Sequence, residues 1–146
     1  MAVGVLSIYF VSCKKEKKED TPKTPESRQS ILSKENWVIS TVEIGGQDIW
    51  SSFIVQACYK DNEYNFKTND TLEIYDKVIK CDAADPDTLY NNYKLLDAEN
   101  KMYLNLELTP IIKINDTATL IELTNSKLKM IANYSGSPAT VTFIKK

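Results

Sequence analysis

The chain has 146 residues, a formal net charge of -2 and three cysteines, and it contains no histidine. Acidic and basic residues are nearly balanced, so the chain lacks the basic excess of nucleic-acid-binding proteins and we expect no such partner. Without histidine it lacks the commonest general base and metal ligand. We therefore expect no enzyme activity, no metal and no cofactor; carboxylate pairs from distant strands remain the open alternative.

The N-terminal residues 2–12 are uncharged and mostly apolar. As a helix they would span about 16 Å, which is too short for a hydrocarbon core of about 30 Å. A signal peptide over residues 1–12 fits better. Signal peptides normally open with basic side chains, whereas here only the amino terminus is positive. We therefore expect either a true start upstream or an atypical peptide.

Val11-Ser12-Cys13 resembles a bacterial lipobox, which implies that Cys13 is acylated and anchors the chain to a membrane. The alternative is a buried cysteine in an apolar helix. Seven consecutive charged residues follow, Lys14 to Asp20, and Thr21 to Ser30 is polar with two prolines. Residues 13–30 therefore read as a lipidated tether, and we expect the folded domain over residues 31–146. Lys18-Glu19-Asp20 resembles a surface-export signal, so we expect an outer-membrane lipoprotein that faces the periplasm or the cell surface.

The first predicted strand starts at Asn36, alternates up to residue 42 and ends at Gly45-Gly46. Its alternation places Trp37, Ile39 and Thr41 on one face, and Val38, Ser40 and Val42 on the other. Residues 47–57 do not alternate strictly, and we expect a short helix or an ordered loop there.

Later strands are predicted as hairpins, because short runs of turn-forming residues separate segments that alternate with period two. The pairs are residues 62–67 with 71–76, 90–96 with 101–108, and 117–123 with 127–134, followed by a strand over 139–145 and an additional short one at 110–114. No long helix is available for parallel crossovers, so we predict an all-β fold whose eight antiparallel strands form an up-and-down barrel. A sandwich is the alternative, but both tryptophans precede Cys58, unlike the immunoglobulin pattern.

Cys58 and Cys81 are 23 positions apart. If Cys13 is lipidated, the mature chain lies in an oxidising compartment, and we predict a disulfide between them. Buried free thiols and a metal pair are the alternatives. Beside Cys81, the acidic segment DAADPD contains Asp82, Asp85 and Asp87. Its spacing differs from a calcium loop, so we expect a solvated turn.

Three segments resemble the lipocalin-like domain of small Bacteroidetes-type lipoproteins. They are residues 58–66 (CYKDNEYNF), residues 80–86 with Lys80-Cys81-Asp82 and Asp85-Pro86, and residues 121–128 (IELTNSKL). Leu32 and Trp37 resemble the opening of that family, although the glycine between them is absent. The resemblance covers residues 31–146. It implies an eight-stranded barrel whose interior can hold a small apolar ligand, and it implies no reaction.

Two functions follow as expectations. In the first, the barrel binds a small apolar or amphipathic ligand, with Trp50 and Phe53 as a lid or a plug. In the second, the barrel is filled and serves as an accessory or interaction module with a protein partner at the outer membrane. The candidate lining of the cavity is Trp37, Ile39, Tyr64, Phe66, Leu72, Ile74, Tyr93, Leu95, Met102, Leu104, Leu128, Met130 and Phe143.

Overall fold

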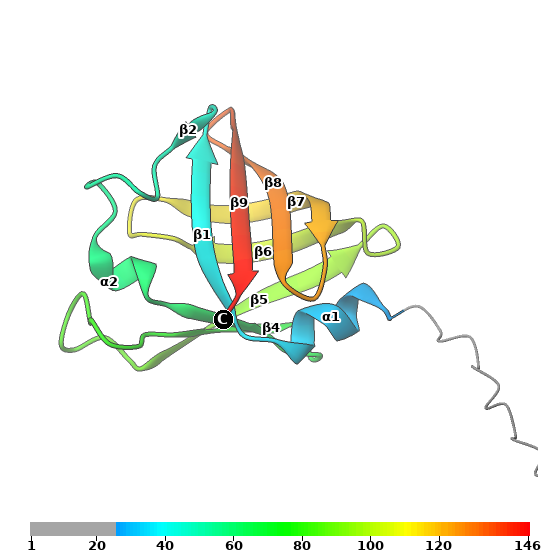
Figure 1. Cartoon of the computed structure of the whole chain (residues 1–146), viewed down its shortest axis with the longest axis horizontal. Coiled ribbons are helices and arrows are strands. Elements are labelled where there is room, and N and C mark those ends of the chain that lie inside the picture. Colours follow the sequence, from blue (N-terminus) through cyan, green and yellow to red (C-terminus); the bar gives the residue numbers. More distant parts are fainter. Residues whose placement is uncertain (1–25) are drawn as a thin grey trace, which may run out of the picture.

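The computed structural model describes residues 26–146, and the proposed signal peptide, Cys13 and most of the tether lie outside that range. Two helices and nine strands follow one another in the order α1 (Arg28–Lys34), β1 (Trp37–Ile44), β2 (Gln47–Asp48), α2 (Ala57–Lys60), β3 (Glu63–Phe66), β4 (Thr71–Tyr75), β5 (Thr88–Leu96), β6 (Lys101–Glu107), β7 (Lys113–Leu123), β8 (Lys127–Tyr134) and β9 (Ser137–Lys145) (Figure 1). Neither helix in this part of the chain is long and apolar enough to cross a bilayer.

The strands close into an antiparallel up-and-down barrel, as predicted. Neighbouring strands pair in chain order from β3 to β9, and β1 completes the ring by pairing with both β3 and β9. The two-residue strand β2 only extends the β1 hairpin. Closure gives a ring of eight strands in which each strand has a partner on both sides.

The three predicted hairpins are confirmed, because β3 pairs with β4, β5 with β6 and β7 with β8. In two of them, turn residues adopt positive φ values. Asp70, between β3 and β4, has a φ of 64°, and Asp97, Ala98 and Glu99, between β5 and β6, have φ values of 49°, 52° and 67°. The short strand predicted at residues 110–114 is not a separate strand, because residues 110–112 lie in a connection and the long strand β7 begins at Lys113. The segment 47–57 is mainly an ordered connection, with β2 at its start and α2 at its end.

A β-bulge changes the predicted faces of β1. Ile39 lies opposite Phe143 and Thr41 lies opposite Thr142, so one extra residue is inserted at Ser40. The insertion shifts the alternation by one position, and Val42 therefore faces the core with Trp37. The sequence prediction that placed Val42 opposite Trp37 was wrong, because strict alternation fails across a bulge.

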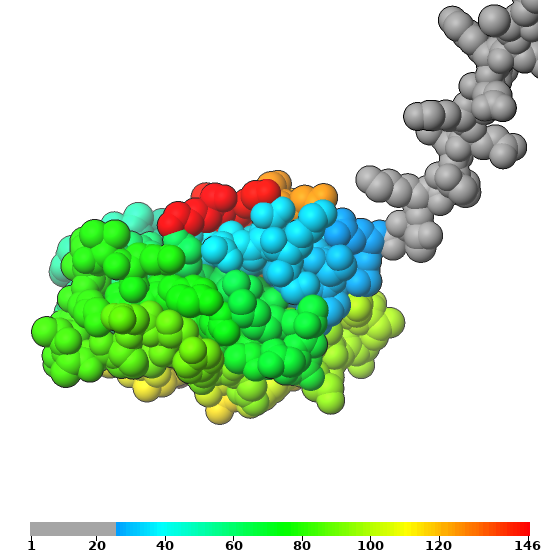
Figure 2. Space-filling model, turned by 90° about the horizontal axis from the view of Figure 1, so that it is seen from below, coloured from blue at the N-terminus to red at the C-terminus, as the bar shows by residue number. Residues whose placement is uncertain are grey.

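Helix α1 covers one end of the barrel, which we call the closed end (Figures 1 and 2). Ser27 caps the helix by accepting a hydrogen bond from the Ser30 amide at 3.1 Å. Leu32 is fully buried, and its carbonyl accepts a hydrogen bond from the Trp37 indole at 3.0 Å. Helix α1 begins at Arg28, three residues before the boundary at Ile31 that the sequence suggests.

The closed end is also fastened by polar contacts from α1. The Arg28 amide and guanidinium donate to the Glu99 carboxylate and carbonyl, both at 2.8 Å. The Gln29 amide donates to the Tyr93 hydroxyl at 2.6 Å, and that hydroxyl donates to the Lys67 carbonyl at 2.6 Å. These bonds join the helix to two hairpin turns.

Candidate functional site

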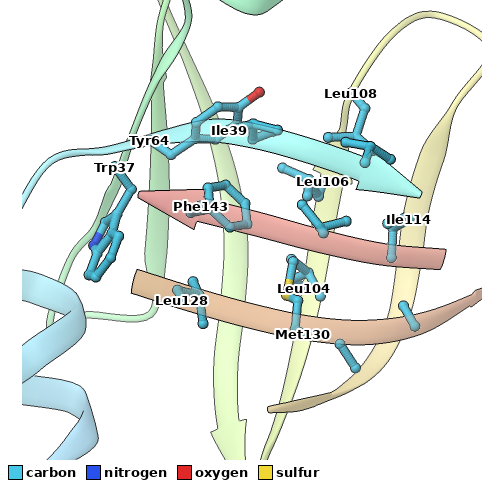
Figure 3. Packing of buried hydrophobic residues seen from close by; sticks show 14 of the residues in the cluster. Trp37, Ile39, Tyr64, Leu104, Leu106, Leu108, Ile114, Leu128, Met130 and Phe143 are labelled. Atoms are coloured by element: carbon cyan, nitrogen blue, oxygen red, sulfur yellow. The ribbon is translucent and has the colours of Figure 1, made fainter. Parts of the chain in front are cut away.

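The residues predicted to line a ligand cavity pack mainly against one another. Twelve of the thirteen are buried in one hydrophobic cluster, and Leu95 is partly buried against it (Figure 3). Phe66 makes edge-to-face contacts with Tyr93 at 5.0 Å and Phe143 at 6.1 Å between ring centroids. These side chains form the core of the barrel, as the filled-barrel interpretation expects.

Trp50 and Phe53, the candidate lid or plug, lie in different environments. Trp50 is buried, and its indole donates to the Ile39 carbonyl at 3.2 Å. Strand β3 pairs with β1 only at Trp37 and Val38, so the Trp50 indole bonds to the first β1 residue beyond that pairing. Trp50 thus belongs to the hydrophobic core, whereas Phe53 is 95% exposed.

A cavity lies at the opposite end of the barrel from α1, which we call the mouth end. Here run the long connections 49–62, 76–87 and 108–112 (Figure 1). Strands β5 and β6 pair over Tyr93–Leu96 and Lys101–Leu104, but towards the mouth end β5 pairs with β4 and β6 pairs with β7. The sheet thus opens between β5 and β6, and a cavity of about 240 Å³ lies beside the opening. We call it the mouth cavity.

The apolar part of the mouth cavity includes the predicted disulfide. Cys58 on α2 and Cys81 in the 76–87 connection are bridged, with their Cα atoms 5.2 Å apart. The other apolar or aromatic lining residues are Tyr59, Ile74, Pro86, Leu89 and Pro110. Of the predicted cavity residues, Ile74 is the one that lines this cavity.

The polar part of the lining consists of Asn62, Asp76, Asp85 and Glu107. Three of these carry carboxylates, and no lysine or arginine belongs to the lining. Asn62 and Asp76 each have a buried side-chain oxygen, Oδ1, without a hydrogen-bond partner in the described structure. Buried acceptors are normally satisfied, so these two atoms are unusual.

Burial raises the pKa of two groups that line the cavity, and nearby carboxylates add to the effect. Loss of hydration on burial raises the pKa of Asp76, and the nearby negative charges of Asp61, Asp85 and Asp87 act in the same direction against the opposing charge of Lys80. Burial also raises the pKa of the Tyr59 hydroxyl, and the charges of Asp85 and Glu107 add to this effect. The cavity is thus an environment of negative potential.

Hydrogen bonds hold the 76–87 connection in place beside the disulfide. The Asp61 carboxylate, just after α2, accepts from the Val78 and Ile79 amides, both at 3.0 Å. The Lys80 ammonium donates to the Asp85 carbonyl at 2.9 Å and pairs with Asp87 at 2.6 Å.

The acidic segment DAADPD folds onto itself. The Asp85 carboxylate accepts from the Asp82 amide at 3.0 Å, and the Asp82 carboxylate accepts from the Ala84 amide at 2.9 Å. Asp82, Asp85 and Asp87 are all exposed residues. The segment is therefore a turn with hydrogen-bonded aspartates, as the sequence suggests.

Exposed apolar side chains also gather at the mouth end. Seven of the nine large exposed hydrophobic residues in the described part of the chain belong to its connections or to the start of β5: Phe53, Ile54, Val78, Ile79, Leu89, Tyr90 and Ile111. Single exposed apolar residues are ordinary, but their concentration at one end of a molecule is typical of binding surfaces.

The sequence missed most of the mouth cavity. The cysteines were the signal that could have located it, because a disulfide joins two segments whose neighbours must then also be close. Asn62 follows Cys58 by four positions and Asp85 follows Cys81 by four. Leu89 and Glu107 had no comparable signal, since their proximity depends on where β5 and β6 separate.

Comparison with models of known protein families finds no match for the chain. A search of curated proteins also finds none.

Proposed function

We propose that the protein is a membrane-anchored, lipocalin-like β-barrel lipoprotein that binds a small amphipathic ligand in the mouth cavity. The observation that carries this proposal is a cavity with an apolar wall and unpartnered polar atoms, located where the barrel wall opens. Ligand sites are generally concave, mostly apolar and equipped with a few polar groups that orient the ligand. A volume of about 240 Å³ limits the ligand to a small molecule.

The packing of the barrel supports a site at the mouth end rather than at its centre. The interior of the barrel from the closed end inward is occupied by large side chains such as Trp37, Tyr64 and Phe143, all at most 1% exposed. A ligand there would have to displace close-packed residues, at a cost of several kcal/mol. The mouth cavity needs no such displacement, and its disulfide holds the wall in place.

The proposed anchor is an acyl group on Cys13, and its support is the resemblance of residues 11–13 to a lipobox. A charged tether would then separate the barrel from the membrane, and the mouth end would lie on the opposite side of the barrel from α1, where the tether joins. Expression of the chain with Cys13→Ala tests this directly. The variant should leave the membrane fraction and lose incorporation of labelled fatty acid; its retention in the membrane would contradict the anchor.

The ligand-binding proposal is tested by native mass spectrometry. The full chain with Cys13→Ala, purified with its disulfide intact, is exposed to an extract of its source cells. We expect a discrete added mass that is lost on denaturation. Leu89→Trp should abolish it, because Leu89 lines the cavity and the larger indole fills the space. Ile121→Trp is the matched control, a half-exposed aliphatic residue on β7, away from the cavity. A bare mass from the parent protein would contradict the proposal.

A second candidate function is docking of a partner protein at the mouth end, as in a filled-barrel interaction module. The exposed apolar residues there favour it. Phe53→Ser, Val78→Ser and Ile111→Ser together should remove a specific cross-linked adduct formed on intact cells, while leaving any ligand mass unchanged. An adduct that survives these changes would exclude this surface.

A further inference from the structure

We infer that the ligand of the mouth cavity is a small amphipathic cation, with an apolar chain and an ammonium head group. This inference rests on the proposed function and specifies its ligand class. It comes from the charges of the lining, from its unsatisfied acceptors and from the division of the cavity into apolar and polar parts.

The charges of the lining are of one sign. Asp76, Asp85 and Glu107 contribute carboxylates to it. Lys113 pairs with Glu107 at 3.0 Å and Lys80 pairs with Asp87 at 2.6 Å, so Asp76 and Asp85 are the lining carboxylates without a lysine or arginine ion-pair partner among the described residues. An anionic head group would be repelled by this lining. A cation would be attracted, and the attraction is strengthened by the low polarity of the neighbouring wall.

The unsatisfied acceptors call for hydrogen-bond donors. Oδ1 of Asn62 and Oδ1 of Asp76 are both buried without a partner, and both residues line the cavity. The terminal torsions of asparagine and aspartate are soft, so either oxygen can turn towards a donor in the cavity. An ammonium group has donors and no acceptor, and it would match these atoms better than a carboxylate or an ether oxygen.

The apolar part of the lining determines the chemistry of the ligand beyond its head group. Ile74 and Leu89 line the cavity from the barrel strands. The disulfide and two prolines, Pro86 and Pro110, line it from the connections. An aliphatic chain buried against them binds about fourfold more tightly for each methylene group removed from water. A strongly hydrated inorganic cation would leave this surface unused, so the apolar wall favours an organic amine.

The test compares three probes with the same alkyl chain: n-octylammonium, n-octanol and n-octanoate. Each is titrated calorimetrically into the full chain carrying Cys13→Ala at neutral pH and low salt. We expect n-octylammonium to bind at least tenfold more tightly than n-octanoate, with n-octanol between them. Asp76→Asn should weaken binding of n-octylammonium about tenfold and leave n-octanol almost unchanged.

Two further variants keep the test decisive. Glu122→Gln removes one negative charge near the closed end, at the β7–β8 hairpin, and should not weaken binding. Glu107→Gln gives a second cavity variant if Asp76→Asn fails to fold, and it should weaken binding several-fold. Equal or tighter binding of n-octanol or n-octanoate would overturn the cation inference and leave the proposed ligand site intact. No binding of any probe, together with a bare mass after exposure to extract, would overturn both.

Discussion

The two ends of the barrel are built on different physical principles. At the closed end, a helix covers the opening, and hydrogen bonds from α1 reach two turns. Behind the helix lie five fully buried aromatic side chains: Trp37, Tyr64, Phe66, Tyr93 and Phe143. At the mouth end, long connections replace the helix, a disulfide and an aspartate hold them, and a cavity of about 240 Å³ remains. The closed end is held mainly by packing of buried side chains, and the mouth end by the disulfide and the hydrogen bonds to Asp61.

The difference assigns stability and the proposed binding function to opposite ends of one small fold. A packed end needs no covalent bond, because burial of large apolar side chains stabilises it directly. An end that keeps a cavity gives up some of that burial, and cross-links offset part of the loss. Substitutions at the closed end should therefore act mainly on folding, and those at the mouth end mainly on binding.

The largest expected effect is at the closed end. Trp37→Ala removes the largest fully buried side chain and its hydrogen bond to the Leu32 carbonyl, and should lower the free energy of unfolding by about 4 kcal/mol. Urea denaturation followed by circular dichroism measures this. Phe53→Ala is the control, since an aromatic residue that is 95% exposed at the mouth end should change stability by less than about 0.5 kcal/mol. Similar losses in the two variants would contradict the comparison.

The closed end was also the easier one to predict from sequence. Strand alternation identified the barrel core, and residues such as Asn69-Asp70 and Asn125-Ser126 marked the hairpins. Helix α1 escaped prediction, because its seven residues are mostly polar and read as a continuation of the tether; only Ser27 marked its start. The bulge at Ser40 escaped as well, since an inserted residue leaves no signature in an alternating strand.

At the mouth end, the sequence predicted the disulfide but not the cavity beside it. The sequence placed Cys58 and Cys81 together, but the cavity depends on two strands that separate partway along their length. No local pattern records such a separation, because β5 and β6 each keep a partner on their other side. The thirteen residues expected to face the inside of the barrel followed from strand alternation, and they lie in its hydrophobic core or, for Leu95, against it.

The next largest effect concerns the cross-link. Cys58→Ser together with Cys81→Ser should cost about 3 kcal/mol of stability, because closing a loop of 23 positions restricts the unfolded chain. Unlike Trp37→Ala, it should also speed amide hydrogen exchange in residues 76–87 more than at the closed end, and weaken ligand binding. Hydrogen exchange with mass spectrometry distinguishes the two ends. Uniform acceleration over the whole barrel would show that the disulfide supports the entire fold.

A smaller effect is expected at the second fastening of the mouth end. Asp61→Ala removes the carboxylate that accepts from the Val78 and Ile79 amides, and should cost about 1–2 kcal/mol. Asp82→Ala provides the matched control, since its bond to the Ala84 amide lies within one exposed turn; the loss there should stay below about 0.5 kcal/mol. Chemical denaturation of both variants measures the difference, and equal losses would remove the special role of Asp61.

The smallest expected effect concerns two carboxylates three positions apart, Glu73 and Asp76. Their contributions to stability should change with pH in opposite directions. Hydrogen bonds from Tyr75 and Lys67 hold the pKa of Glu73 below its ordinary value, so its contribution to stability is lost as the pH falls through the folded-state pKa. Burial raises the pKa of Asp76, so folding favours its protonated form, and that contribution is lost as the pH rises through the folded-state pKa.

At neutral pH, Glu73→Gln should therefore destabilise the protein and Asp76→Asn should stabilise it, each by less than about 1 kcal/mol because both sites are close to solvent. Both differences should shrink in acid, where the parent carboxyls become neutral like their amide replacements. Thermal melting from neutral to acidic pH checks both signs. A gain in stability from Asp76→Asn that coincides with loss of n-octylammonium binding would mean that Asp76 is kept for its charge in the cavity, at the expense of the fold. Destabilisation by Asp76→Asn at neutral pH would instead make Asp76 a structural residue of the mouth end.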